Sequence, residues 1–161
     1  MKRFLFITVL VCLAFWAEFV LYNILGPWGK PELMVLAIVF CNLYWGIRHS
    51  IWAAFTAGIL KDAFGIEPFG THLFVYTVAA YLTAFTRDAI YQPGSRFSRA
   101  VVAFFVLTGV FILEILLHMR FFEVRVEEAA AFIFVPRMVL TMATATFVFH
   151  RLRDTVVKFK L

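Results

Sequence analysis

The sequence predicts an all-α integral membrane protein with six transmembrane helices, and three observations lead to that fold class. Hydrophobic residues make up 63% of the 161 residues, against roughly 45–50% in soluble proteins. Charged residues fall to 16%, where about 25% is usual. Long apolar runs, separated by short polar segments, nearly use up the chain. A soluble domain of this size could not bury so much apolar surface, and no length remains for a soluble catalytic domain.

The apolar runs define the predicted spans, since a spanning helix needs about 20 mostly apolar residues. The first, fifth and sixth runs are long enough to span. The middle three are short, and the third is also compatible with a re-entrant segment. Together they form one transmembrane domain over residues 1–161, with spans at 4–25, 33–47, 50–64, 71–85, 100–118 and 129–149.

The first run must be distinguished from a signal peptide, because it follows a basic start. It is too long for a signal sequence, it contains Glu18, and it lacks a small-residue cleavage site. We therefore interpret it as a transmembrane helix. The turn after it, residues 26–31, carries Trp28 at the predicted membrane interface. Pro93 and Gly94 mark the turn between the fourth and fifth helices.

The basic residues predict the orientation, because cytoplasmic loops of membrane proteins are rich in Lys and Arg. The segments on the side of the termini hold ten basic residues and the opposite side holds four, so both termini are predicted to be cytoplasmic. The ten are Lys2, Arg3, Arg48, Arg87, Arg96, Arg99, Arg151, Arg153, Lys158 and Lys160; the four are Lys30, Lys61, Arg120 and Arg125.

Three ionisable residues lie inside predicted spans, where a charge costs several kcal/mol unless it is paired or hydrated. Glu18, Glu114 and Arg137 are expected about 6–12 Å below the outer surface. One hypothesis is that Arg137 pairs with Glu114 or Glu18 inside the bundle. The alternative is that each carboxylate is protonated or reaches outward, with no shared site. Pro136, directly before Arg137, is expected to bend the last helix.

A corner between the third and fourth helices is the most informative stretch. Gly58 and Asp62 share one helix face, and Gly65, Pro68 and Gly70 then end the helix and reverse the chain before His72. Asp62 could accept hydrogen bonds from free backbone N–H groups of the turn, and the Thr71 hydroxyl could cap the next helix. Two interpretations stay open: a rigid capped hairpin, or a functional contact at Asp62.

A stripe of small residues on the third helix is the predicted face for a partner helix, because small side chains let transmembrane helices approach closely. The stripe consists of Ala53, Ala54, Ala57 and Gly58.

Motifs for catalysis, metal binding and phosphate binding are missing from the sequence. The four histidines, His49, His72, His118 and His150, lie at predicted helix ends and form no ligand-like spacing. Cys12 and Cys41, both inside apolar runs, exclude a disulfide scaffold. We expect no enzyme activity, no cofactor and no metal, and the net charge of +5 reflects membrane orientation rather than nucleic-acid binding.

The motif Gly58, Asp62, Gly65, Pro68, Gly70 and His72, in a small six-span chain, resembles MreD, the family of rod shape-determining membrane proteins. Pro31-Glu32-Leu33, Trp45-Gly46 and the basic end at residues 150–153 fit the family less specifically. Only residues 58–72 are distinctive. Glu67 and the charged segment 119–128, which is compatible with a loop or a short strand, depart from the family pattern.

The resemblance implies a non-catalytic component of the bacterial elongation machinery in the cytoplasmic membrane. Family members bind the bitopic protein MreC and help connect MreB filaments to a SEDS glycosyltransferase and a class B penicillin-binding protein. The resemblance also implies a fold similar to the substrate-binding subunits of energy-coupling-factor vitamin transporters. Glu18, Glu114 and Arg137 are then candidates to line an outward pocket.

Two other function classes remain as alternatives. A substrate-binding subunit of a vitamin-type transporter would use the buried charges and the outer corner. A membrane enzyme acting on a lipid-linked substrate would need clustered carboxylates or histidines at one interface, and the external carboxylates are too scattered in the sequence to favour it.

Overall fold

The computed structural model describes residues 2–26, 30–65, 68–91, 95–121 and 129–159. These residues form α-helices and no strands, which confirms the predicted all-α class. Trp28, Glu67 and the charged residues of 122–128 lie outside the described residues. The helices are α1 (Lys2–Leu25), α2 (Leu33–Trp45), α3 (Ile47–Phe64), α4 (Thr71–Ile90), α5 (Arg96–Phe121) and α6 (Ala129–Phe159).

The helices begin close to the first residues of the predicted spans, but several extend beyond the last residues of those spans. α2, α4 and α6 begin where the apolar runs begin, whereas α4, α5 and α6 continue past the ends of those runs into polar sequence. A single residue, Gly46 with φ 84°, separates α2 from α3. Among the described residues, two helical segments are long and apolar enough to cross a membrane, Lys2–Leu25 and Phe97–Leu117, and two apolar helical segments are shorter, Leu33–Trp45 and Pro136–Phe149.

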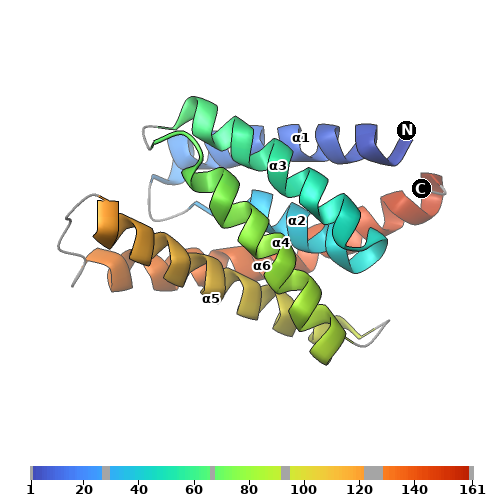
Figure 1. The fold of residues 1–161 in the computed structure, drawn as a ribbon. Coiled ribbons are helices and arrows are strands. Elements are labelled where there is room, and N and C mark those ends of the chain that lie inside the picture. Colours follow the sequence, from blue (N-terminus) through green and yellow to red (C-terminus); the bar gives the residue numbers. More distant parts are fainter. Residues whose placement is uncertain (1, 27–29, 66–67, 92–94, 122–128, 160–161) are drawn as a thin grey trace.

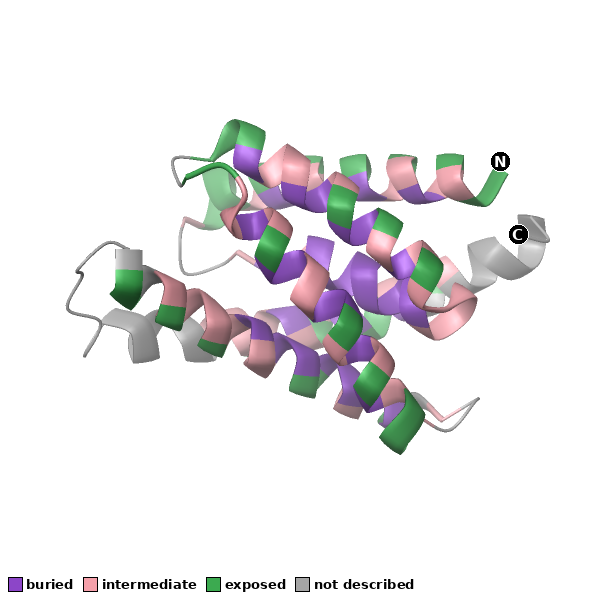
Figure 2. Cartoon of the chain, in the orientation of Figure 1, coloured by how far each residue is buried: buried purple, intermediate pink, exposed green. Residues whose placement is uncertain are grey.

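α2 is the centre of the structure and contacts each of the other five helices (Figure 1). Its residues from Met34 to Asn42 are all buried, and Figure 2 shows buried ribbon in the middle of the bundle. A helix that is apolar on every side can lie against lipid or against other helices. The sequence LMVLAIVFC has no polar face, and in this structure other helices cover it.

The outer surface is apolar as well, the reverse of a soluble protein. Large hydrophobic side chains are exposed on α1 (Leu5, Trp16), on α4 (Phe85), on α5 (Phe97) and on α6 (Val139, Phe147), each with more than half of its surface open. This distribution fits a chain whose outer surface meets lipid.

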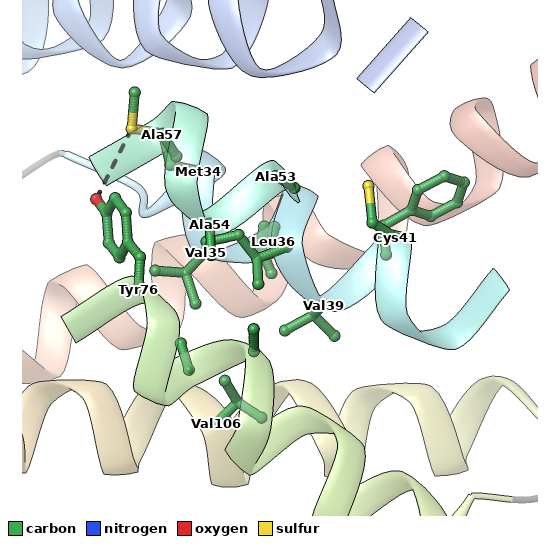
Figure 3. Packing of buried hydrophobic residues seen from close by; sticks show 14 of the residues in the cluster. Met34, Val35, Leu36, Val39, Cys41, Ala53, Ala54, Ala57, Tyr76 and Val106 are labelled. Carbon is green, nitrogen blue, oxygen red and sulfur yellow. Dashed lines mark hydrogen bonds between the residues drawn. The ribbon is translucent and has the colours of Figure 1, made fainter. Parts of the chain in front are cut away.

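The small-residue stripe on α3, the predicted face for a partner helix, does not face outward in this structure. Ala53, Ala54 and Ala57 are fully buried, and Gly58 is buried as well. Figure 3 shows the three alanines packed among residues of α2 and α4, including Met34, Leu36 and Tyr76. The helices that approach the stripe belong to this chain.

Gly58 lies at a close approach of α3 to α4. A Cβ atom at this position would lie 2.5 Å from the Leu73 Cα and 2.9 Å from the Leu73 nitrogen. Both atoms belong to the backbone of α4, so they could make room only if the two helices separated. Glycine at position 58 therefore sets the distance between the helices on either side of the corner.

We predict that Gly58→Ala lowers the free energy of unfolding by about 1–3 kcal/mol, because the added methyl group overpacks the α3–α4 contact. The sign of the change in unfolding free energy is the test, because replacing Gly by Ala in an unconstrained helix raises that free energy by roughly 1 kcal/mol. Thermal unfolding in detergent measures the change. Gly109→Ala is the matched control, because its new Cβ would meet the movable end of the Leu82 side chain; a stabilised Gly58→Ala protein would contradict the close approach.

Candidate functional site

A cluster of charged side chains gathers where α1, α2, α3, α5 and α6 meet, on the side of the molecule that the sequence predicts to face outward. It contains as many carboxylates as cations, so its formal charge is zero. We call it the charged cluster, and it consists of Glu18, Lys30, Glu32, Lys61, Glu114 and Arg137.

Glu32 is the central member of the charged cluster. Its carboxylate forms ion pairs with Arg137 of α6 and, at 3.5 Å, with the Lys61 ammonium of α3. Its backbone N–H donates to the Thr141 hydroxyl of α6 at 3.1 Å. Glu32 is also the N-cap residue of α2. This one residue therefore joins the start of the central helix to α3 and to α6.

Arg137 connects Glu32 to Glu114, whose carboxylate lies 3.7 Å from a guanidinium nitrogen of Arg137. The structure thus brings Arg137 together with Glu114, one of its two predicted partners. Glu18, the other predicted partner, accepts a hydrogen bond from the backbone N–H of Met34 at 2.8 Å. Glu18 therefore satisfies one of the free N–H groups at the start of α2.

The charged cluster continues into α4 through Tyr76. The Lys61 ammonium donates to the Tyr76 hydroxyl at 2.8 Å. That hydroxyl is 3.7 Å from the Met34 sulfur (Figure 3). Lys30 lies in the turn before α2, and burial lowers the pKa of its ammonium to about 8, with a smaller effect from nearby Lys61.

A small cavity borders the charged cluster between α2, α5 and α6. Glu32, Glu114, Arg137 and Thr141 supply its polar lining, and the rest of the wall is apolar. Its volume is about 20 Å³, which is room for about one water molecule. The cluster is thus filled mainly by its own side chains.

The predicted corner is built around Asp62 at the end of α3. One carboxylate oxygen of Asp62 accepts from the backbone N–H groups of Gly70, at 2.9 Å, and Leu73, at 3.1 Å. The other accepts from the backbone N–H of His72 and contacts the His72 Nδ1, both at 2.9 Å. The side chain of Asp62 is fully buried. A carboxylate at the N-terminus of α4 is favourable because it pairs with the free N–H groups and the helix dipole.

The side chain that caps the N-terminus of α4 is therefore Asp62. The sequence had suggested that the Thr71 hydroxyl could do this. Thr71 is the first helical residue, its hydroxyl donates to the carbonyl of Pro68 at 2.8 Å, and no capping bond comes from the N-cap residue Gly70 itself. Gly70 has φ 105°, a left-handed conformation that glycine adopts without strain. The contacts support the capped-hairpin interpretation of the corner.

The opposite end of α2 is capped by Arg87 of α4. Its guanidinium donates to the backbone carbonyl of Asn42 at 3.1 Å and to the Asn42 side-chain oxygen at 3.2 Å. The Asn42 amide in turn donates to the carbonyl of Ala80 at 2.9 Å. A cation at a helix C-terminus satisfies free carbonyls and the negative end of the dipole.

Sequence reasoning missed Glu32 and Lys61 as members of the charged cluster, because both were assigned to the outer surface. One signal was present: the second apolar run is short, so its ends must lie below the membrane surface, and Glu32 directly precedes it. Asn42, inside that run, was a second signal. No pattern in the sequence pointed to Arg87 as the partner of Asn42.

The contacts of this arrangement hold helices together. Among those residues, no group of three potential metal ligands lies together. His72 faces the capping carboxylate Asp62. Each contact of the charged cluster joins segments that are distant in the sequence.

We predict that Asp62→Asn lowers the free energy of unfolding by roughly 2–4 kcal/mol, because an amide nitrogen replaces an oxygen that faces backbone N–H donors. Thermal unfolding in detergent measures the loss. Asp88→Asn removes a carboxylate whose side chain is 71% exposed and which pairs with the neighbouring Arg87; a surface pair of this kind contributes little, so little change is expected. Equal stability of the two variants would remove Asp62 from its capping role.

Replacement of Arg137 by Met is expected to destabilise the protein by about 3–5 kcal/mol, because breaking a buried ion pair leaves a charge uncompensated. The stability of Arg137→Lys should lie between those of the unsubstituted protein and Arg137→Met. Lysine keeps the charge, but its ammonium lacks the planar fork with which a guanidinium contacts two carboxylates. The same unfolding assay compares both with Arg120→Met, which alters an exposed residue. If Arg137→Met unfolds no earlier than Arg120→Met, the ion pairs contribute nothing to stability.

The comparisons with known proteins agree with the resemblance carried by the corner. No curated protein and no solved structure matches the chain significantly. The model of a protein family described as rod shape-determining protein MreD matches residues 1–153, nearly the whole chain. With its apolar helices, the capped corner from Gly58 to His72 and this match, the chain belongs to the MreD family of rod shape-determining membrane proteins.

Proposed function

We propose that the protein is a non-catalytic scaffold of the bacterial cell-elongation complex. In this role it binds a MreC-like bitopic membrane protein. Through that partner it helps couple MreB-like filaments to a SEDS glycosyltransferase and a class B penicillin-binding protein during peptidoglycan synthesis. The observation that carries the proposal is the family match over residues 1–153.

The proposed setting is the inner membrane, crossed six times with both termini in the cytoplasm. The exposed apolar side chains on α1, α4, α5 and α6 support a lipid-covered outer surface. The asymmetry of basic residues supports the orientation. Charged residues buried in the bundle find partners from neighbouring helices, as the low dielectric of a membrane demands.

The interior supports a scaffold over the transporter alternative. A vitamin-type subunit needs a pocket of several hundred Å³ for its ligand. The cavity beside Glu114 and Arg137 measures about 20 Å³, and ion pairs already engage both side chains. Two of the three residues expected to line a pocket thus pair with each other, and the cavity that the described residues form beside them is much smaller than a vitamin-sized ligand.

The decisive experiment is affinity purification of the tagged chain from its own bacterium in a mild detergent, with the partners identified by mass spectrometry. Recovery of a single-span MreC-like protein is the expected result, because a scaffold must hold a stable partner. An unrelated multi-span protein with the same tag is the control. Recovery of a pair of ATPase subunits in place of a single-span protein would favour the transporter function and overturn the proposal.

A further inference from the structure

We propose that the protein binds the phosphate of one anionic phospholipid between the start of α5 and the end of α2, at a site formed by Arg99, Tyr44 and Tyr91. The site lies on the side of the bundle that is predicted to face the cytoplasm, at the opposite end of α5 from the charged cluster. The inference requires that the chain spans a membrane, and it does not depend on which protein partner the chain binds.

Arg99 is a buried cation without a countercharge among the described residues. It is 8% exposed, and its described polar contact is a hydrogen bond that its guanidinium donates to the Tyr44 hydroxyl, at 3.0 Å. That hydroxyl is neutral, so it leaves the positive charge uncompensated. Asp88, the acidic residue nearest to Arg99 in the sequence, pairs with Arg87 instead. A buried charge in this state is unfavourable until an anion approaches it.

The N-terminus of α5 adds a second attraction for an anion. Its first turn contains Arg96 and Arg99 and no acidic residue. A helix N-terminus carries a partial positive charge, so arginines there are unfavourable, whereas a phosphate is favourable. The Ser95 hydroxyl accepts from the backbone N–H of Ser98 at 3.2 Å, but it supplies no negative charge. The helix end and Arg99 therefore favour the same kind of ligand.

Two tyrosine hydroxyls add hydrogen-bond donors beside Arg99. Tyr44, in the last turn of α2, accepts the bond from Arg99, and its own proton is left to donate. Tyr91 directly follows α4 and packs partly against the core. Burial raises the pKa of the Tyr91 hydroxyl, with a further increase from Tyr44, whereas Arg99 lowers it. The three groups are thus near enough to act on one another, and each can donate to a phosphate oxygen.

The remaining N–H groups of Arg99 are open to a ligand. A guanidinium has five N–H donors, and the described bond of Arg99 uses one of them. Among the described residues, the buried side-chain nitrogen that lacks a hydrogen-bond partner is Arg137 Nε, not a nitrogen of Arg99. The free donors of Arg99 therefore end at the part of its surface that stays open.

A phospholipid fits this position better than a free phosphate ion. Arg99 directly precedes the predicted fifth span, which begins at Ala100, and this is the level of the lipid headgroups. Phe85, Ile90 and Phe97, on the two helices that meet here, are large and exposed, so acyl chains can cover them. Anionic lipids are abundant in the cytoplasmic leaflet, and basic pockets between transmembrane helices on that side bind their headgroups.

Titration of the full-length protein with lipid, in a maltoside detergent, tests the proposal. Dioleoyl phosphatidylglycerol is the anionic probe, dioleoyl phosphatidylcholine has the same chains without a net charge, and inorganic phosphate represents the free ion. Native mass spectrometry counts the lipids bound to each chain, and thermal unfolding checks that each variant is folded. Arg99→Gln removes the charge of the site. Arg48→Gln is the matched control, because Arg48 is an exposed arginine in the first turn of α3, on the same predicted side.

We expect the unsubstituted protein to bind one phosphatidylglycerol in preference to phosphatidylcholine. Arg99→Gln should weaken that binding about tenfold, because a hydrogen bond between charged groups is lost, and Arg48→Gln should leave it unchanged. Arg99→Lys keeps the charge and should restore part of the affinity. Equal losses in Arg99→Gln and Arg48→Gln would indicate unspecific attraction and overturn the proposal, and so would equal binding of the two lipids.

Two further results also decide. Inorganic phosphate that displaces phosphatidylglycerol at equal concentration would make the ligand a free ion and overturn the lipid assignment. If Arg99→Gln fails to fold, Tyr91→Phe replaces it, since this variant removes one hydroxyl and leaves the charge in place. Binding of phosphatidylglycerol that is about threefold weaker in Tyr91→Phe supports the site, and unchanged binding overturns it.

Discussion

The structure depends on one constraint: its central helix is buried along its length and short. α2 has 13 residues, about 20 Å, against a hydrocarbon core of about 30 Å. In the proposed six-span arrangement, both of its ends lie where water cannot satisfy free backbone groups. Glu18 of α1 and Thr141 of α6 bind N–H groups at its beginning, and Arg87 of α4 binds carbonyls at its end. These polar side chains inside the bundle thus supply hydrogen-bond partners for the free backbone groups at the two ends of α2.

The N-terminus of α4 is capped in the same way as that of α2, by a carboxylate from the preceding helix. Glu18 precedes the α2 N-terminus that it caps, and Asp62 precedes the α4 N-terminus that it caps, each carboxylate coming from the preceding helix in the chain. Capping across a hairpin fixes two helices relative to one another, whereas a cap from the helix's own N-cap residue fixes only one. The unusual buried acids thus work as structural joints between consecutive helices.

Much of this architecture could be predicted from the sequence, and the limits have a physical reason. The apolar runs gave the helices, and the glycines and Pro68 gave the corner, because those signals are local. Glu18, Glu114 and Arg137 could be identified as intramembrane charges because each stands inside an apolar run, which is again a local signal. The partners Glu32 and Thr141 come from segments that are 109 residues apart, and no pattern in one sequence encodes such a contact. The small-residue stripe packs inside the chain, and no sequence pattern separates that case from a partner face, because both kinds of packing demand the same residues.

The distribution of the charged cluster along the chain has a consequence for the way the protein is made. Glu18, Lys30, Glu32 and Lys61 leave the ribosome first, and their two carboxylates and two ammonium groups balance. Glu114 of α5 then adds a third carboxylate, and its countercharge Arg137 comes from the final helix. A chain interrupted between α5 and α6 therefore keeps one carboxylate of the cluster in excess, and the last helix to be synthesised restores the balance of charge inside the bundle.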